Sequence, residues 1–200
     1  YYQQSDGSYT PGLDTRQGPI EDWNGSYTGY YMRKFLDPSV NHQYDKQPYP
    51  WRQIRYAEVL LNYAEACIEL GEDVEARKYI NMIRERAKNT QHVKTMDQSQ
   101  DAANYKVGVY DEPFKSKNEA VQALRMERRL EMAHEGIRFF DLVRWGVADE
   151  VINAYIAKEK VFRSHLQNAH FVKGKHEYFP IPQSMIDICG TEVMKQNPGY

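Results

Sequence analysis

The chain has 200 residues, a net charge of −2 and a pI of about 6.3. Its lysines and arginines are scattered, so the charge pattern favours neither nucleic acid nor an anionic lipid surface as a partner. No apolar run approaches the roughly 20 residues that a helix needs to cross a bilayer. The length suits one domain or one large part of a domain.

Residues 1–50 are rich in Gly, Pro, Tyr, Asp and Asn and lack helical periodicity. The turn dipeptide Asn24-Gly25 lies between Trp23 and Tyr27. This pattern predicts a short hairpin or irregular strands between loops.

The apolar residues of the next segment form two neighbouring helical stripes: Ile54, Ala57, Leu61, Ala64 and Ile68 in one, and Tyr56, Leu60, Tyr63 and Cys67 in the other. A helix that is apolar on two faces is expected to be buried between neighbours. Gly71 is expected to end it in the left-handed conformation, and Asp73 to cap a second helix. The pair resembles a tetratricopeptide repeat, so further repeats are expected upstream, since one pair cannot bury its own face.

Residues 88–115 are polar and lack periodicity. A segment of this length is long for a connection between helices, which indicates that it is either functional or mobile. The sequence from Ser116 to Glu119 is a capping box that predicts the start of another helix. Cys67 and Cys189 are expected to be free, buried thiols, because they lack metal-ligand or CxxC spacing.

The most informative segment spans residues 121–146. Its predicted apolar face consists of Ala123, Met126, Leu130, Ala133 and Ile137, with Arg125, Arg128, Glu131 and Glu135 on the opposite side. Four arginines and no lysine occur between residues 125 and 138, which suits forked pairing with carboxylates. We therefore predict a structural ion-pair network rather than an active site: Arg125, Arg128, Glu131, Glu135, Arg138 and Asp141.

Gly136 is expected to interrupt the helix before the apolar cluster around Trp145, and a helix is expected to continue from Val147 to Lys160. A short strand is predicted near residues 176–179, and a last helical turn near residues 184–188. The expected fold class is mostly α, with small irregular β elements and long loops.

Four motifs carry a resemblance to a known family: Gly29–Phe35, Ile54–Ala66, Leu124–Gly146, and a C-terminal ending made of Tyr178–Pro182 and Gln196–Tyr200. In this order they resemble the SusD/RagB family of outer-membrane nutrient-binding lipoproteins of Bacteroidetes. Met185 departs from the family, which often has Glu after the Pro-Ile-Pro turn.

The resemblance implies that residues 1–200 are the C-terminal part of a SusD-like domain, and the start at Tyr1 agrees with a fragment. We expect a loop- and hairpin-rich segment (1–50), a tetratricopeptide-like helical hairpin (51–88), the helices of the Glu-Arg-Arg segment (116–160) and a C-terminal segment (161–200). The lipid-anchored cysteine would lie upstream.

The implied function is non-catalytic capture of an oligosaccharide or related nutrient at the outer-membrane surface. The ligand would pass to a SusC-like, TonB-dependent transporter. No cofactor, metal site or nucleic-acid partner is expected, because the six histidines lack zinc spacing and phosphate-binding glycine motifs are absent. Two alternatives stay open: a helical-repeat scaffold for a protein or peptide, and a glycan-degrading enzyme using Glu127, Glu131 and Glu135. Neighbouring arginines are expected to lower the pKa of these carboxyls, which disfavours a general acid.

Sixteen Tyr and three Trp supply rings on which the apolar faces of sugars can stack. The candidate glycan-binding residues are Trp23, Asn24, Tyr27 and Tyr30, next to the predicted turn. Packing in a core explains Trp23 equally well. Trp51 and Trp145 adjoin helical apolar patterns and are expected to belong to the core.

Overall fold

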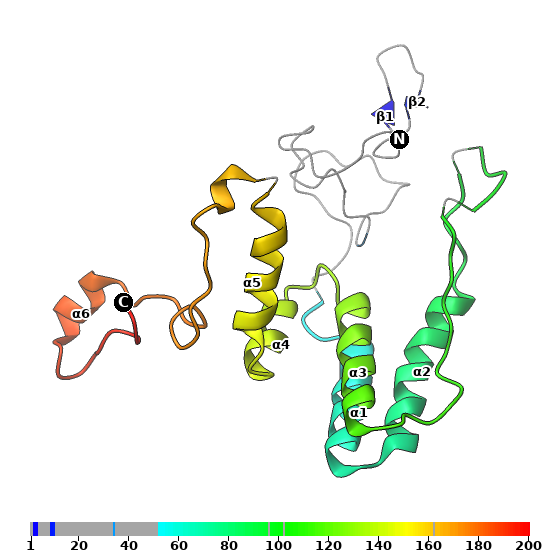
Figure 1. The fold of residues 1–200 in the computed structure, drawn as a ribbon, viewed down its shortest axis with the longest axis horizontal. Coiled ribbons are helices and arrows are strands. Elements are labelled where there is room, and N and C mark those ends of the chain that lie inside the picture. Colours follow the sequence, from blue (N-terminus) through cyan, green and yellow to red (C-terminus); the bar gives the residue numbers. More distant parts are fainter. Residues whose placement is uncertain are drawn as a thin grey trace. The chain divides into compact units, whose positions relative to one another are not determined.

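The computed structural model describes residues 52–200 except 96, 102 and 162, together with Lys34 and the backbone of the strand pair near the N-terminus. The described chain is mostly helical, as predicted (Figure 1). Its helices are α1 (Tyr56–Leu70), α2 (Asp73–Asn89), α3 (Lys117–Glu131), α4 (Arg138–Arg144), α5 (Ala148–Glu159), η2 (Ser164–Leu166) and α6 (Gln183–Cys189). The strands β1 (Tyr2–Gln3) and β2 (Tyr9–Thr10) pair antiparallel, Tyr2 with Thr10.

The chain forms two compact units, and each is described by itself. One unit holds α1, α2 and α3 and spans Phe35–Arg138. The other consists of Tyr1–Lys34 and Phe139–Tyr200.

The turn between α1 and α2 follows from one glycine. Gly71 has φ +79° and ψ +18°, the left-handed conformation expected of it. Its N–H donates to Ile68 O at 3.2 Å, and the N–H of Glu72 donates to Cys67 O at 2.8 Å. The expected role of Asp73 was wrong: it is the first residue of α2, and Glu72 precedes the helix without a side-chain cap. Asp73 still places a negative charge in the first turn, which the helix dipole favours.

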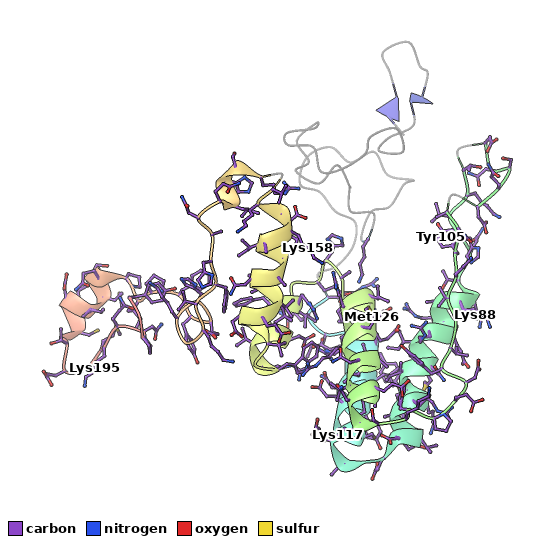
Figure 2. The ribbon with its side chains drawn as sticks, viewed as in Figure 1. Lys88, Tyr105, Lys117, Met126, Lys158 and Lys195 are labelled. Carbon is purple, nitrogen blue, oxygen red and sulfur yellow. The ribbon has the colours of Figure 1, made fainter. Side chains whose placement is uncertain are left out.

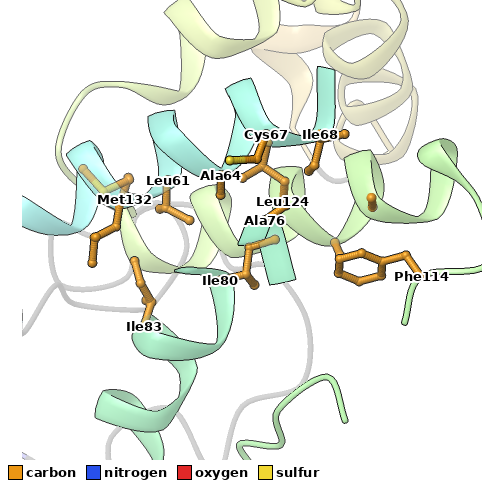
Figure 3. Packing of buried hydrophobic residues seen from close by; sticks show 13 residues of the cluster. Leu61, Ala64, Cys67, Ile68, Ala76, Ile80, Ile83, Phe114, Leu124 and Met132 are labelled. Atoms are coloured by element: carbon orange, nitrogen blue, oxygen red, sulfur yellow. The ribbon is translucent and has the colours of Figure 1, made fainter. Parts of the chain in front are cut away.

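The core of this unit lies where α1, α2 and α3 meet (Figure 3). Its largest fully buried side chains are Leu61 and Ile68 of α1, Ile80 of α2 and Leu124 of α3. Cys67 is buried beside them as a free thiol, as predicted, whereas the free Cys189 in α6 is only half-buried. The second predicted stripe of α1 is covered only in part within the described chain: Leu60 and Cys67 are buried, but Tyr56 is 70% exposed and Tyr63 is 50% exposed.

Helix α3 begins as the capping box predicts. The Ser116 hydroxyl accepts from the N–H of Glu119 at 3.2 Å. The Glu119 carboxylate accepts from the N–H of Lys115 at 2.6 Å, one residue earlier than in the standard box.

The buried face of α3 differs from the predicted one. Met126 is 49% exposed and Leu130 is 59% exposed. The face in the core consists of Ala120, Ala123, Leu124, Glu127 and Arg128. The prediction failed because it ranked side chains by hydrophobicity alone, and buried charges are tolerated when they have partners. The helix also ends at Glu131, and His134 (φ +64°) and Gly136 (φ +79°) shape the turn that follows.

The other unit has a smaller core around Leu142, Ala148 and Phe171. Trp145 is partly buried against it, in agreement with its predicted core position. Gly146, with φ +68°, separates α4 from α5. Asn153 of α5 holds the main chain of Phe171 with a pair of hydrogen bonds of 3.0 and 2.8 Å.

The strand predicted near residues 176–179 was wrong, because the chain forms turns there. The N–H of Val172 donates to His176 Nδ1 at 2.8 Å, which closes the loop locally instead of leaving the main chain for a partner strand. The last predicted helical turn is confirmed as α6, which begins after Pro182.

Candidate functional site: a buried charge network and an exposed ring pair

Two charged residues of α3 lie inside the core. Glu127 is 5% exposed and Arg128 is 2% exposed. Arg84 of α2 reaches Glu127 Oε2 with Nη1 at 2.8 Å, and Arg128 donates from Nη1 to Asn62 Oδ1 of α1 at 2.7 Å. Glu127 therefore has an oppositely charged partner on α2, and Arg128 has a hydrogen-bond acceptor on α1. Buried charged groups need such partners.

A second part of the network surrounds Arg55, the residue before α1. Its guanidinium makes a forked contact with Glu135: Nε donates to Oε2 at 2.8 Å and Nη2 to Oε1 at 2.7 Å. Its Nη1 lies 2.9 Å from Glu131 Oε1. Arg86 of α2 pairs with the other oxygen of Glu131 at 2.5 Å. Arg55 and Glu131 therefore connect the start of α1 with the end of α3 and with α2.

Hydrogen bonding and burial shift the pKa values of two residues of this network, Arg55 and Glu127. The hydrogen bonding of Arg55 to the Glu135 carboxylate, which accepts, raises the pKa of the guanidinium, and burial opposes this rise. Burial raises the pKa of Glu127, and the hydrogen bond from Arg84 opposes that rise. The expectation that neighbouring arginines lower the pKa was therefore wrong for Glu127, because loss of solvation outweighs its partner. Glu127 nevertheless lies in the core and is bonded to Arg84, an arrangement suited to structure rather than to proton transfer to a substrate.

The predicted network residues are distributed over both units. Arg128, Glu131 and Glu135 belong to the unit of α1–α3. Asp141 of α4 is 3% exposed and pairs with Arg144, whose Nε lies 2.9 Å from Oδ1. Arg125 lies half-buried on α3, and Arg138 begins α4.

The sequence reasoning missed the partners of these residues. Arg55 precedes α1, Arg84 and Arg86 lie on α2, and none of them was singled out. Arg55 lies 80 positions from Glu135, and no local spacing indicates a contact at that separation. The surplus of arginine over lysine was the available signal, since it indicates forked pairing without naming the pairs.

The predicted glycan-binding residues Trp23, Asn24, Tyr27 and Tyr30 lie outside the described residues, as does Trp51. The described part of the chain offers a different aromatic group. His92 and Tyr105 are stacked with ring centroids 4.4 Å apart and an interplanar angle of 27°. They lie on the segment that leaves α2 and returns to α3, where Figure 2 labels Tyr105.

Among the described residues, no three His, Cys, Asp or Glu side chains gather closely enough to hold a metal ion. None of the described helices is long and apolar enough to span a membrane.

The comparisons with known proteins agree with one another. The sequence model of the SusD family matches residues 1–200. Two similar proteins of Formosa agariphila are SusD-like protein P25, 30% identical over 137 residues, and SusD-like protein P38, 38% identical over 98 residues. These alignments cover 67% and 49% of this chain but 21% and 17% of the relatives, so the chain spans about a fifth of their length.

A solved structure shows the same fold. The crystal structure of a SusD homolog from Bacteroides thetaiotaomicron superposes with a TM-score of 0.53 at 30% sequence identity. The superposition covers 75% of this chain and 27% of that one. With the family match along the whole sequence and this agreement in fold, the chain belongs to the SusD family.

Proposed function

We propose that the protein of which this chain is a part captures an oligosaccharide or related nutrient at the cell surface, without catalysis. The observation that carries the proposal is the match of the SusD family along residues 1–200. The charge network supports the non-catalytic part. The carboxylates of Glu127, Glu131 and Glu135 are all bonded to arginines.

The bound ligand passes to a SusC-like, TonB-dependent transporter in the outer membrane, and a lipid anchor upstream of this chain holds the protein there. This delivery step and this location rest on what the family resemblance implies.

A carbohydrate-array screen of the full-length protein, followed by calorimetry with the strongest ligand, tests the capture function. Saturable binding without release of products is the expected result. Trp23→Ala is expected to weaken that binding while leaving the melting temperature nearly unchanged. Unaltered affinity in this variant would remove Trp23 from the binding site but leave the proposed function in place.

One observation favours a second candidate, a scaffold that binds a protein or peptide. Tyr56, Val59 and Tyr63 form an exposed apolar row along α1, at 70%, 48% and 50% exposure. A full-length protein that retains a polypeptide in pull-down and shows no response on the carbohydrate array would establish this alternative.

The enzymatic alternative is a glycan-degrading activity that uses Glu127, Glu131 and Glu135. Product release from a polysaccharide panel that Glu131→Gln abolishes would establish it. The bonds from Glu131 to Arg55 and Arg86 argue for the opposite result.

A further inference from the structure

The segment between α2 and α3 is fixed to α2 at its returning end (Figure 1). Asn81 of α2 donates to Tyr110 O at 2.9 Å and accepts from the Tyr110 N–H at 2.8 Å. Arg84 donates to Gly108 O at 2.5 Å, and its guanidinium carbon lies 4.9 Å from the centre of the Tyr110 ring. The long connection is thus anchored to α2 by specific polar contacts at Gly108 and Tyr110.

The part beyond this anchor, residues 91–107, is called the arm here. Lys94 and Asp101 face each other in an isolated antiparallel bridge. Lys94 Nζ lies 2.6 Å from one oxygen of the Asp101 carboxylate, and His92 Nδ1 lies 2.7 Å from the other. At the tip, Asp97 accepts from the Ser99 N–H at 3.1 Å and from the Thr95 hydroxyl at 2.5 Å. Polar contacts hold the arm, and none of its described residues belongs to a hydrophobic core cluster.

The ring pair lies on this arm. Tyr105 is 39% exposed and stacks on His92, and neither ring belongs to a hydrophobic core cluster of the described chain. The other described aromatic pairs, among them Tyr63–Tyr79 and Tyr110–Phe114, meet edge to face. Within the described residues, the Tyr105 hydroxyl makes no hydrogen bond. The pair therefore combines a ring supported on one face, a free hydroxyl and charged groups beside it.

We propose that the arm contacts the carbohydrate ligand, with the Tyr105–His92 pair as a stacking platform for one sugar ring. The apolar face of a pyranose suits a flat ring whose orientation is already fixed, because little side-chain freedom is lost on binding. The Tyr105 hydroxyl, Lys94 and Asp101 supply donors and acceptors for sugar hydroxyls at the edge of the platform. This inference rests on the proposed function. It assigns a ligand contact to the arm, outside the predicted binding residues Trp23–Tyr30.

The test uses the full-length protein and the strongest glycan found on the carbohydrate array. Tyr105→Ala is expected to weaken binding about tenfold, which corresponds to roughly 1.4 kcal/mol. Tyr105→Phe keeps the platform and is expected to retain most of the affinity. Tyr155→Ala is the matched control, because Tyr155 is 55% exposed on α5 and stacks on no other ring among the described residues. Each variant is accompanied by its melting temperature.

Asn81→Ala tests the anchor. It removes both hydrogen bonds to the Tyr110 main chain but leaves the side chains of Tyr105 and His92 unmutated. Weaker binding than in the wild type, with Tyr105→Ala adding little further loss, is the expected result.

The possible outcomes separate the two proposals. If the wild type binds a glycan and Tyr105→Ala binds it equally well, the platform is overturned and the proposed function stands. If the wild type binds no glycan on the array, both fall together. If Tyr105→Ala loses a polypeptide partner while keeping its glycan affinity, the arm is a protein contact and the inference is wrong.

Discussion

Arg55 and Glu135 lie 80 positions apart in the sequence and form a two-bonded ion pair, with Nε–Oε2 at 2.8 Å and Nη2–Oε1 at 2.7 Å. Their side chains are 15% and 11% exposed, so the pair is largely withdrawn from water. This contact ties the residue before α1 to the turn after α3, and its removal leaves Glu135 poorly solvated.

We therefore expect Arg55→Ala to lower the free energy of opening of α1 and α3 by roughly 2–4 kcal/mol, near the cost of breaking a buried ion pair. Arg55→Lys should recover little of that loss, because an ammonium group cannot make the forked contact. Hydrogen exchange of the full-length protein, resolved on these helices, measures the change. Lys78→Ala is the control: its pair with Glu75 is exposed, so a loss below about 1 kcal/mol is expected. Equal effects of Arg55→Ala and Lys78→Ala would contradict the prediction.

Gly71→Ala is expected to destabilise the α1–α2 hairpin by about 1–2 kcal/mol, the cost of the left-handed conformation for a residue with a Cβ. A Cβ at this position would meet no atom within 4 Å, so the loss comes from the backbone alone. Gly108→Ala is a matched control, since its surroundings are equally open and its φ lies outside the left-handed region. Hydrogen exchange on α1 and α2 distinguishes them, and a neutral Gly71→Ala would contradict the assignment.

Glu127 predicts a pH dependence of stability. Because burial raises its folded pKa above the ordinary value near 4.5, the folded state holds the proton more firmly than the unfolded state. The contribution of Glu127 to stability is therefore greatest below the unfolded pKa and declines as the pH rises through the raised folded value. Glu127→Gln, which resembles the protonated form, should gain stability relative to the wild type as the pH rises from about 4 to 7. Exchange measurements on α3 across this range test the sign. A shift in favour of the wild type would show that the pairing with Arg84 outweighs burial.

The two cysteines are expected to differ in reactivity. Cys67 is 2% exposed, and burial raises the pKa of its thiol, so little reactive thiolate forms at neutral pH. Cys189 is only half-buried. Iodoacetamide at pH 8 should therefore modify Cys189 in the native full-length protein well before Cys67, as read by peptide mass mapping. Similar rates in guanidinium chloride provide the control, and similar rates in the native protein would contradict the described burial.

The sequence predicted the locally encoded features well. The left-handed Gly71, the Ser116 cap and the last helix after Pro182 each depend on a few adjacent residues. The buried face of α3 could not be predicted in this way. Hydropathy selected Met126 and Leu130, whereas Glu127 and Arg128 are buried because Arg84 and Asn62, far away in the sequence, supply their partners.

The candidate site could likewise be predicted from the sequence only in part. The excess of arginine around α3 indicated ion pairs, but the partners Arg55, Arg84 and Arg86 could be identified only from the fold. Tyr105 and His92 are 13 positions apart in a segment without periodicity, so their stacking depends on the path of the arm. The predicted residues Trp23, Asn24, Tyr27 and Tyr30 stay a prediction.

The buried charges of α3 also restrict how that helix can sit in its unit. Three helices joined only by aliphatic side chains can exchange one packing register for another at modest cost. Sliding α3 by one turn, or rotating it by one residue, would separate Glu127 from Arg84 and Arg128 from Asn62, and the buried carboxylate and guanidinium of α3 would lose these partners. We therefore expect replacement of these four side chains by aliphatic ones to preserve helix content while allowing several alternative alignments of α3.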